Sequence, residues 1–337
     1  MKYRRVGDKD LIISEIGFGC GGNAGLMVRE EAKDQIAVIE RALERGITYF
    51  DNAPDYGNGK AEANLGRVLK ELRVRPVINS KVEIRAVNLD DIAGHVVRSA
   101  EASLTRLGIE QLDVFQVHNG PSRYRPRLEG EDYRQLWLED FLRPGGACEG
   151  IDRLKQAGKI RHAGFICRGD DADAVTTLLD TGLFSLINVP YTVLNPTAGL
   201  PKPQALQAMD FGNVIEIAQG HGVGAAIYSP LAGGVLTDAF LRGTARHPLA
   251  RAIDTESPEM RDIAARAAKL AFLPDSGESL AQAAYRFVLS NPGVATVLGG
   301  FSAVEQVEEL CAASGHEPIA LEKMRRLAAL WESNFDG

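Results

Sequence analysis

A short unit recurs six times along the chain, in which an amphipathic helical pattern ends at a glycine and runs directly into a β-branched or aromatic segment. Glycine after a helix supplies a left-handed cap, and a continuous apolar run between polar residues is typical of a strand buried on both faces. The six segments are RGITYFD from Arg45, LGIEQLDVFQVH from Leu107, AGKIRHAGF from Ala157, TGLFSLINV from Thr181, HGVGAAIY from His221 and NPGVATVL from Asn291. The repeated unit predicts helices that alternate with strands.

Two further apolar runs, EIGFG from Glu15 and PVINSKV from Pro76, bring the expected buried strands to about eight. Helices long enough to connect such strands force them to pair in parallel. Eight alternating units predict an α/β fold with one closed (β/α)8 TIM barrel over residues 1–337, because a doubly wound sheet would show five or six strands and a second composition zone.

The helices can be placed by their apolar period. In the stretch from Glu30, Ile36, Ile39 and Leu43 share a face. A second helix is expected after an N-cap at Asn88. Its buried face would carry Ile92, Val96, Ser99 and Ser103, with Leu104 and Leu107 beside them.

Two irregular stretches, 119–148 and 231–258, follow strand ends and are predicted to be loops at the barrel mouth, where barrel enzymes place substrate loops. At the other end of the chain, Leu321, Met324, Leu327 and Leu330 form one face of a C-terminal helix. Closing the barrel is the commoner use of such a face, and contact with a partner is the alternative.

Composition excludes several classes of protein. With 45% hydrophobic and 25% charged residues, disorder and coiled coil are not expected, and a net charge of −7 gives no field that attracts nucleic acid or anionic lipid. No apolar run is long enough for a signal peptide or a membrane span, so we expect a cytoplasmic protein. The scattered cysteines predict free thiols and neither disulfides nor a metal site; they are Cys20, Cys148, Cys167 and Cys311.

Four polar residues are predicted to meet at the mouth of the barrel. Asp51, Lys81 and His118 each end an expected strand, and Tyr56 follows Asp51 by five residues. A neighbouring ammonium at Lys81 would lower the pKa of the Tyr56 phenol, which is about 10 when unperturbed. Asp51 would keep Lys81 charged, and His118 would orient a carbonyl oxygen. Such a set makes a proton donor.

The segment GFGCGG, from Gly17 to Gly22, fits the G-x-G-x-x-G pattern of dinucleotide-binding loops. That pattern requires a helix to open at once and an acidic residue to end the next strand about 20 residues later. Here Asn23 to Val28 intervene, and Glu40 and Glu44 lie within an expected helix. We therefore interpret these glycines, Gly19 among them, as a strand end that lets a ligand approach the backbone.

The sequence resembles the aldo-keto reductase family along nearly its whole length. The segments that carry the resemblance are YRRVGDKDLIISEIGFG, FDNAPDYGNGKAEANLG, the SK at Ser80, the QVH at Gln116, GKIRHAGF, YSPLAGG and GGFSAVEQVEEL. The resemblance implies an amino-terminal β-hairpin that plugs the barrel floor and NAD(P)(H) bound across the mouth. It also implies a catalytic tetrad of Asp51, Tyr56, Lys81 and His118, the same set as above.

The resemblance also implies cofactor contacts. Tyr228 would stack on the nicotinamide, Ser229, Leu231 and Gly233 would lie along the pyrophosphate, and the adenosine end would be surrounded by Gly300, Phe301, Ser302, Gln306 and Glu309. Phe301 is a candidate to stack on adenine, with a place in the core as the alternative.

The chain departs from the family where the cofactor binds. Ile166 and Cys167 replace the usual Ser-Asn that holds the nicotinamide carboxamide, and Asn188 replaces the usual Gln. An amide at Asn188 can still supply that contact. Residues 291–320 contain no Lys or Arg, so we lean towards NAD over NADP, whose 2′-phosphate needs charged partners.

The leading hypothesis is reversible hydride transfer between the nicotinamide and a small carbonyl or alcohol substrate, with Tyr56 as general acid and base. By resemblance to bacterial sugar dehydrogenases, the substrate would be a sugar or hydroxylated ring compound, and the loop arginines and aromatics would line its site; a solvated loop is the alternative. Those loop residues are Arg123, Tyr124, Arg125, Arg127, Tyr133, Trp137 and Phe141. Two other hypotheses are a redox sensor like the potassium-channel beta subunits and a metal-dependent hydrolase that uses Asp51 and His118. The oligomeric state stays open.

Overall fold

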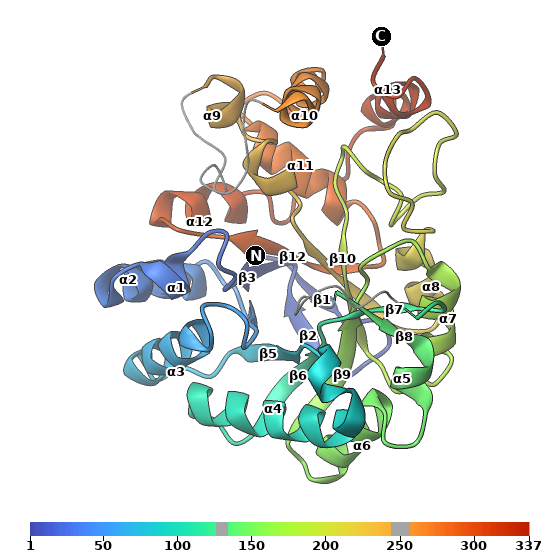
Figure 1. Cartoon of the computed structure of the whole chain (residues 1–337). Coiled ribbons are helices and arrows are strands. Elements are labelled where there is room, and N and C mark those ends of the chain that lie inside the picture. Colours follow the sequence, from blue (N-terminus) through green and yellow to red (C-terminus); the bar gives the residue numbers. More distant parts are fainter. Residues whose placement is uncertain (126–133, 244–256, 337) are drawn as a thin grey trace.

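The computed structural model describes residues 1–125, 134–243 and 257–336. Eight parallel strands form a closed barrel in the order β10-β11-β12-β3-β4-β5-β6-β9, and the helices surround it (Figure 1). The strands are β3 (Ile16–Gly19), β4 (Tyr49–Asp51), β5 (Val77–Val82), β6 (Leu112–Val117), β9 (Ile160–Ile166), β10 (Leu186–Pro190), β11 (Gly224–Tyr228) and β12 (Val294–Gly300). They fall on the eight segments that the sequence predicts, so the (β/α)8 barrel is confirmed.

Helices connect the barrel strands. They are α2 (Ala32–Glu44), α3 (Lys60–Leu72), α4 (Ile92–Leu107), α6 (Ala147–Gln156), α7 (Ala172–Leu179), α8 (Val214–Gly220), α11 (Leu280–Leu289) and α12 (Val304–Cys311). The remaining helices are α1 (Leu26–Arg29), η1 (Ala86–Asp91), α5 (Leu138–Leu142), η2 (Ala232–Gly234), α9 (Asp238–Leu241), α10 (Pro258–Ala268) and α13 (Leu321–Glu332).

Five of the six predicted glycine junctions adopt the left-handed conformation. They are Gly46, Gly108, Gly158, Gly182 and Gly222, with φ between 66° and 88°. Gly293 is not among the residues with positive φ. A Cβ there would lie 2.7 Å from Ile215 of α8, so this position needs glycine for lack of space.

An antiparallel hairpin of β1 (Tyr3–Arg5) and β2 (Ile12–Ser14) closes the amino-terminal end of the barrel. Val6, Leu11 and Ile13 of this hairpin are buried and pack against barrel residues such as Tyr49 and Leu186. The structure thereby confirms the hairpin that the family resemblance implies. A ligand must enter from the opposite, carboxyl-terminal end of the strands.

The first mouth loop folds into a small sheet of β7 (Gly120–Ser122) and β8 (Gln135–Trp137), followed by α5. Trp137 Nε1 donates to the Arg123 carbonyl oxygen over 3.2 Å, and Phe141 is fully buried. Arg123 forms ion pairs with Asp171 and Asp173. These contacts favour the interpretation that Trp137 and Phe141 hold the loop on the barrel. Arg127 and Tyr133 lie outside the described residues.

Two expectations about helices are corrected. Asp91, and not Asn88, caps α4, since its side chain accepts from Gly94 N over 3.1 Å while Asn88 lies in the preceding η1 turn. In α13, Leu327 is buried but Leu321 is 66% exposed. The buried face of this helix instead ends at Trp331, whose ring packs on Phe287 of α11 at a centroid distance of 5.9 Å.

Accordingly, α13 lies at the periphery beyond α11 and does not cover the mouth (Figure 1). All four cysteines are free, as the sequence predicts. Among the described residues, no helix has the length and apolar character that a membrane crossing needs.

The contact between α3 and α4 yields a stability prediction. A Cβ on Gly66 of α3 would lie 2.7 Å from the carbonyl carbon of Leu107, which is backbone and cannot rotate away. We expect Gly66→Ala to lower the free energy of unfolding by about 1 to 3 kcal/mol despite the better helix propensity of alanine. Gly220→Ala in α8 is the matched control, since no atom lies within 4 Å of its Cβ. Urea unfolding of both variants tests this, and equal stability of the two would contradict it.

Candidate active site

The four residues predicted to carry the chemistry meet at the carboxyl-terminal end of three neighbouring strands. Asp51 ends β4, Lys81 lies in β5 and His118 directly follows β6. Lys81 forms a buried ion pair with Asp51 and donates to the Asn52 carbonyl oxygen over 2.7 Å. Its Nζ lies 5.2 Å from the centre of the Tyr56 ring. Tyr56 and His118 face each other edge to face with centroids 6.1 Å apart.

A buried amide network holds Asp51 from below. Its Oδ2 accepts from Asn79 Nδ2 over 2.7 Å and from Asn188 Nδ2 over 3.0 Å. Gln116 joins the two amides, because its Oε1 accepts from Asn79 over 2.8 Å and its Nε2 donates to Asn188 over 2.8 Å. Asp51 therefore has both carboxylate oxygens engaged and one fixed orientation.

Sequence reasoning missed Asn79 and missed Gln116 as a site residue. The available signal was their spacing, since they precede Lys81 and His118 by two residues on the same strands. Residues two apart on a strand point to the same face. A polar residue at that position therefore belongs to the same barrel interior as the catalytic group.

Asn188 uses both ends of its side-chain amide in this hydrogen-bond network. Its amide oxygen accepts from Gln116 and its nitrogen donates to Asp51. An amide nitrogen carries two hydrogens, so one donor remains for the predicted contact with a nicotinamide carboxamide. That contact stays a prediction.

Burial is the largest influence on the pKa of Tyr56. Burial raises the pKa of the phenol, while the charge of Lys81 and a side-chain hydrogen bond to it lower that pKa. The net pKa lies above the usual value of 10.0. The lowering by Lys81 that the sequence predicts is therefore present but outweighed, and Tyr56 keeps its proton at neutral pH. Burial also lowers the pKa of Lys81, but Asp51 and Tyr56 more than offset this and raise it overall.

His118 is neutral at physiological pH. Burial lowers the pKa of its imidazole to about 4, and its hydrogen bond with Asp55 only partly opposes this shift. The Asp55 Oδ2 atom lies 3.4 Å from His118 Nδ1. His118 thus has one ring nitrogen facing a carboxylate that the sequence analysis did not single out.

Asp55 and Glu83 form a carboxyl pair beside His118. Burial and the Asp55 carboxylate raise the pKa of Glu83 to about 7, whereas hydrogen bonds from His118 and Glu83 outweigh burial and lower the pKa of Asp55 to about 2. Near neutral pH the pair therefore shares about one proton. Arg85 lies 3.6 Å from Asp55 and 3.5 Å from Glu83.

One oxygen or nitrogen from each of Asp55, Glu83 and His118 lies within 4.8 Å of the others, a spacing that a metal ion would tolerate. The Arg85 guanidinium already supplies positive charge to both carboxylates. Asp51, the acid of the hydrolase hypothesis, is instead paired with Lys81. These contacts give the metal hypothesis no support.

The loop after β11 has the backbone expected of a phosphate cradle. Ser229, Ala232 and Gly233 adopt left-handed conformations with φ of 54°, 48° and 72°. Leu231, with φ of −96° and ψ of 16°, directly precedes the left-handed Ala232, and successive N–H groups in such turns form concave nests that bind anions. Tyr228 ends β11 and is half-buried, and Leu231 is half-buried beside it. The donor set therefore fits the pyrophosphate of NAD(P)(H), as the resemblance implies.

The glycine segment after β3 lies beside the Tyr56 ring. A Cβ on Gly21 would contact the Tyr56 ring at 3.7 Å, and one on Gly22 would meet no atom within 4 Å. Helix α1 begins only at Leu26, so the segment does not open a helix as a dinucleotide fingerprint does. Gly19 is half-buried at the end of β3.

The predicted adenosine residues lie together after β12, with one correction. Gly300, Ser302, Gln306 and Glu309 are exposed or half-buried, and Ser302 N donates to Gln306 Oε1 over 2.8 Å. Phe301 is fully buried, with its ring 5.1 Å from that of Phe18. Its side chain therefore belongs to the core and is not open to adenine.

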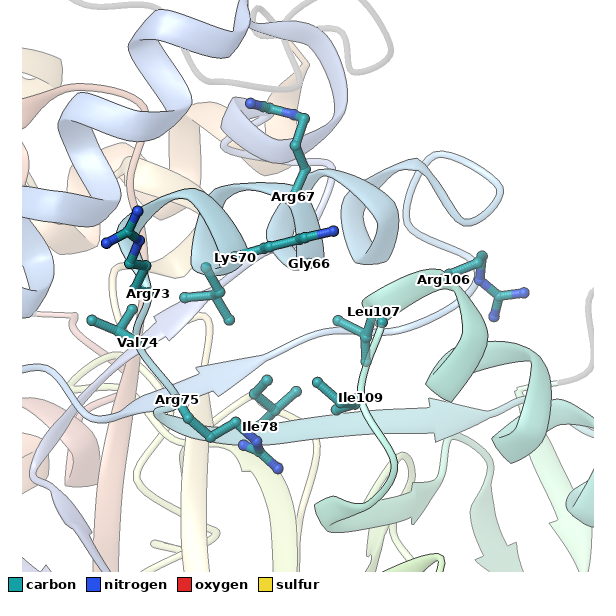
Figure 2. A pocket seen from close by; sticks show the side chains of 12 residues that line it. Gly66, Arg67, Lys70, Arg73, Val74, Arg75, Ile78, Arg106, Leu107 and Ile109 are labelled. Carbon is teal, nitrogen blue, oxygen red and sulfur yellow. The ribbon is translucent and has the colours of Figure 1, made fainter.

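A hollow of about 600 Å³ elsewhere is lined by cationic side chains of Arg67, Lys70, Arg73, Arg75 and Arg106 (Figure 2). It lies between α3 and the end of α4, beside the first residues of β5. That is the end of the barrel opposite the tetrad. Arg75 and Arg106 are already paired with Asp113 and Glu62, so the hollow is no part of the catalytic site.

Comparison with known proteins agrees with this geometry. The model of the Aldo/keto reductase family matches residues 15–332. The chain belongs to the aldo/keto reductase family.

Two curated relatives match more than nine tenths of the chain. L-galactose dehydrogenase of Arabidopsis thaliana is 27% identical over 93% of this chain and 88% of its own length. A protein of the same plant named "Probable voltage-gated potassium channel subunit beta" is 26% identical over 92% of this chain and 90% of its own length. Among solved structures, an aldo-keto reductase from Klebsiella pneumoniae in complex with NADPH superposes with a TM-score of 0.68 at 21% identity, over 98% of this chain and 95% of that one. This last likeness concerns the fold.

The raised pKa of Glu83 predicts a pH-dependent stability. The unfolded side chain ionises near its ordinary pKa of 4.5 and the folded one near 7, so the stabilisation present below pH 4.5 is lost as pH rises to about 7. We expect Glu83→Gln to remove this loss and to gain about 2 kcal/mol over the wild type between pH 5.5 and 8.5. Urea unfolding at both pH values measures the difference, with the exposed Glu322→Gln as control. A constant gap between Glu83→Gln and wild type would contradict the assignment.

Proposed function

We propose that this protein catalyses reversible hydride transfer between NAD(P)(H) and a carbonyl or alcohol substrate, with Tyr56 as the general acid and base. The observation that carries the proposal is the buried Lys81–Asp51 ion pair beside the Tyr56 ring. The same ring faces His118 on its other contact. The bound nicotinamide would supply or accept the hydride at the substrate carbon. The protein's own groups then handle the proton at the substrate oxygen.

Tyr56 donates that proton in reduction and takes it back in oxidation. It is protonated at neutral pH, and burial makes its phenolate costly unless Lys81 stabilises it. The ammonium of Lys81, kept charged by Asp51, supplies this stabilisation as negative charge develops on the phenol oxygen. The same ion pair serves both directions, because it stabilises the deprotonated state that each direction passes through.

His118 positions the substrate oxygen. When Nδ1 donates to Asp55, Nε2 can accept the hydrogen of an alcohol. When the protonated carboxyl of the Asp55–Glu83 pair donates a hydrogen bond to Nδ1, the ring hydrogen lies on Nε2, which can donate to a carbonyl oxygen. The carboxyl pair therefore lets one neutral imidazole fit both the alcohol and the carbonyl.

A slow redox sensor is the second candidate. Similarity to the plant protein named as a potassium channel subunit supports it. Ile166 and Cys167 are buried apolar replacements for the polar pair that the family usually presents to the nicotinamide. A cofactor-binding protein without steady-state turnover across a broad carbonyl and sugar panel would favour the sensor.

We infer a sugar or other hydroxylated compound as the substrate. The mouth beside His118 offers carboxyl and guanidinium groups from Asp55, Glu83 and Arg85, which suit recognition of hydroxyl groups. The similarity to L-galactose dehydrogenase supports the same substrate class.

The proposal predicts the effect of removing the phenol hydroxyl. We expect Tyr56→Phe to lower kcat roughly 100- to 10,000-fold, because the general acid is lost. Cofactor binding, measured by fluorescence titration, should stay within about twofold, since the substitution removes one hydroxyl and keeps the ring. A variant with near wild-type turnover would refute the role of Tyr56.

We also infer a preference for NAD(H), on the ground that residues 291–320 contain no Lys or Arg. Helix α2 packs against α12, and there Arg41 of α2 and its C-cap residue Arg45 form ion pairs with Glu308. NADH should therefore bind more tightly than NADPH in a fluorescence titration.

The exposed Ser302 offers a matched variant for this preference. Ser302→Arg places a guanidinium at the adenosine end and should tighten NADPH about fivefold while NADH stays unchanged. Tighter binding of NADPH by the wild type would overturn the inferred preference.

A further inference from the structure

Arg168 stands at the mouth of the barrel, two residues beyond the end of β9. Its backbone is fixed by the small sheet of the first mouth loop. A Cβ on Gly120 of β7 would lie 2.7 Å from Arg168 N, and Gln135 Nε2 of β8 donates to the Arg168 carbonyl oxygen over 3.1 Å. The position of Arg168 is therefore set by packing on both sides of the backbone.

The charge of Arg168 acts on the groups that surround the reacting centre. Burial is the main cause of the shifted pKa values of Tyr56, His118 and Tyr228, and the Arg168 charge lowers all three. These side chains come from the loop after β4, the end of β6 and the end of β11. The Arg168 charge therefore acts at the same rim of the barrel as these groups, beyond the carboxyl-terminal end of β9.

Within the described ranges, the Arg168 guanidinium has neither a hydrogen bond nor an ion pair, although the residue is half-buried. Other arginines nearby are satisfied. Arg85 contacts Asp55 and Glu83, Arg123 contacts Asp171 and Asp173, and Arg143 contacts Asp140. A half-buried cation loses part of its hydration, and an anionic group of a bound ligand would restore a hydrogen-bond partner.

The carboxyls beside His118 carry little net charge once Arg85 is counted. Near neutral pH, the Asp55–Glu83 pair still holds about one proton, because the pKa of Glu83 is raised to about 7 by burial and by Asp55. The single remaining negative charge is offset by Arg85. No carboxylate in the described part of the chain forms an ion pair with Arg168.

We propose that Arg168 binds an anionic group, a carboxylate or a phosphate, that the substrate carries a few bonds from its reacting carbonyl. This inference rests on the proposed hydride-transfer function and names the substrate class for that site. A planar guanidinium binds either group through two parallel hydrogen bonds. Arg168 directly follows the unusual Ile166-Cys167 pair in the sequence.

Two matched pairs of aldehydes test the proposal. They are 4-carboxybenzaldehyde against benzaldehyde and glyceraldehyde 3-phosphate against glyceraldehyde. The wild type should show a higher kcat/KM for the charged member of at least one pair, which also tells carboxylate from phosphate. Arg168→Gln should lower that charged-to-neutral ratio roughly 10- to 100-fold, with the neutral aldehyde within about threefold. Arg168→Lys should recover part of the ratio, since lysine keeps the positive charge but lacks the planar guanidinium that makes two parallel hydrogen bonds.

Arg153→Gln is the control for net charge, because Arg153 is exposed on α6 and forms its ion pair with Glu149 of the same helix. It should leave the ratio unchanged. An unchanged ratio in Arg168→Gln, or a wild type that prefers both neutral aldehydes, would overturn the proposal.

The cofactor pyrophosphate is the other anion that could reach Arg168. If Arg168→Gln weakens cofactor binding more than tenfold and lowers both members of each aldehyde pair equally, the anion belongs to the cofactor and the substrate assignment is wrong. An unchanged cofactor Kd together with a reduced ratio supports it.

A binding measurement separates this inference from the proposed function. Calorimetric titration of the cofactor-loaded protein with benzoate and with inorganic phosphate needs no turnover. Loss of anion binding in Arg168→Gln, in a protein that reduces none of the four aldehydes, would leave the subsite in place and refute the reaction. Equal anion binding by wild type and variant would refute the subsite, whatever the activity.

Discussion

The buried ion pair between Lys81 and Asp51 is the interaction on which the site depends. Both side chains are almost completely removed from water. A buried pair repays its desolvation only when further hydrogen bonds satisfy the remaining donors and acceptors, and removing one partner costs about 3 to 5 kcal/mol. Asn79 and Asn188 supply those bonds to Asp51, and the Asn52 carbonyl supplies one to Lys81. The barrel interior below the mouth is therefore a polar layer built around one ammonium.

This polar layer lies at the mouth, whereas apolar side chains close the opposite end of the barrel. The hairpin fills the amino-terminal end with Val6, Leu11 and Ile13, so the apolar core stops below the amide network. Tyr56 and His118 lie above the network and receive its electrostatic effect through Lys81. The site thus lies on top of the amide network and the apolar core, which exclude water from below. The low dielectric there strengthens the effect of each charge on the Tyr56 phenol.

Sequence patterns predicted the parts of this arrangement that period and chain order determine. Strand ends located Asp51, Lys81 and His118, because a parallel barrel brings all carboxyl-terminal strand ends to one rim. Asn79 and Gln116 followed the same alternation but were overlooked, since a single polar residue in an apolar strand has no visible partner in the sequence. Burial was harder still: the ring of Phe301 is in the core and Leu321 is in solvent, and each depends on tertiary neighbours such as Phe18 and Trp331. The pKa of Tyr56 was misjudged for the same reason, because burial acts through the whole surroundings while Lys81 acts as one residue.

The net charge of the chain does not determine the charge at the mouth of the barrel. The chain carries −7 overall, yet fixed charges farther than about 8 Å are largely screened at physiological ionic strength. Around Tyr56, the Asp51 carboxylate is cancelled by Lys81 and the Asp55 carboxylate by Arg85. Glu83 holds its proton until about pH 7, because burial and Asp55 raise its pKa. Arg168 adds a cation that has no ion pair among the described residues, so the proposed anion subsite is compatible with an acidic protein.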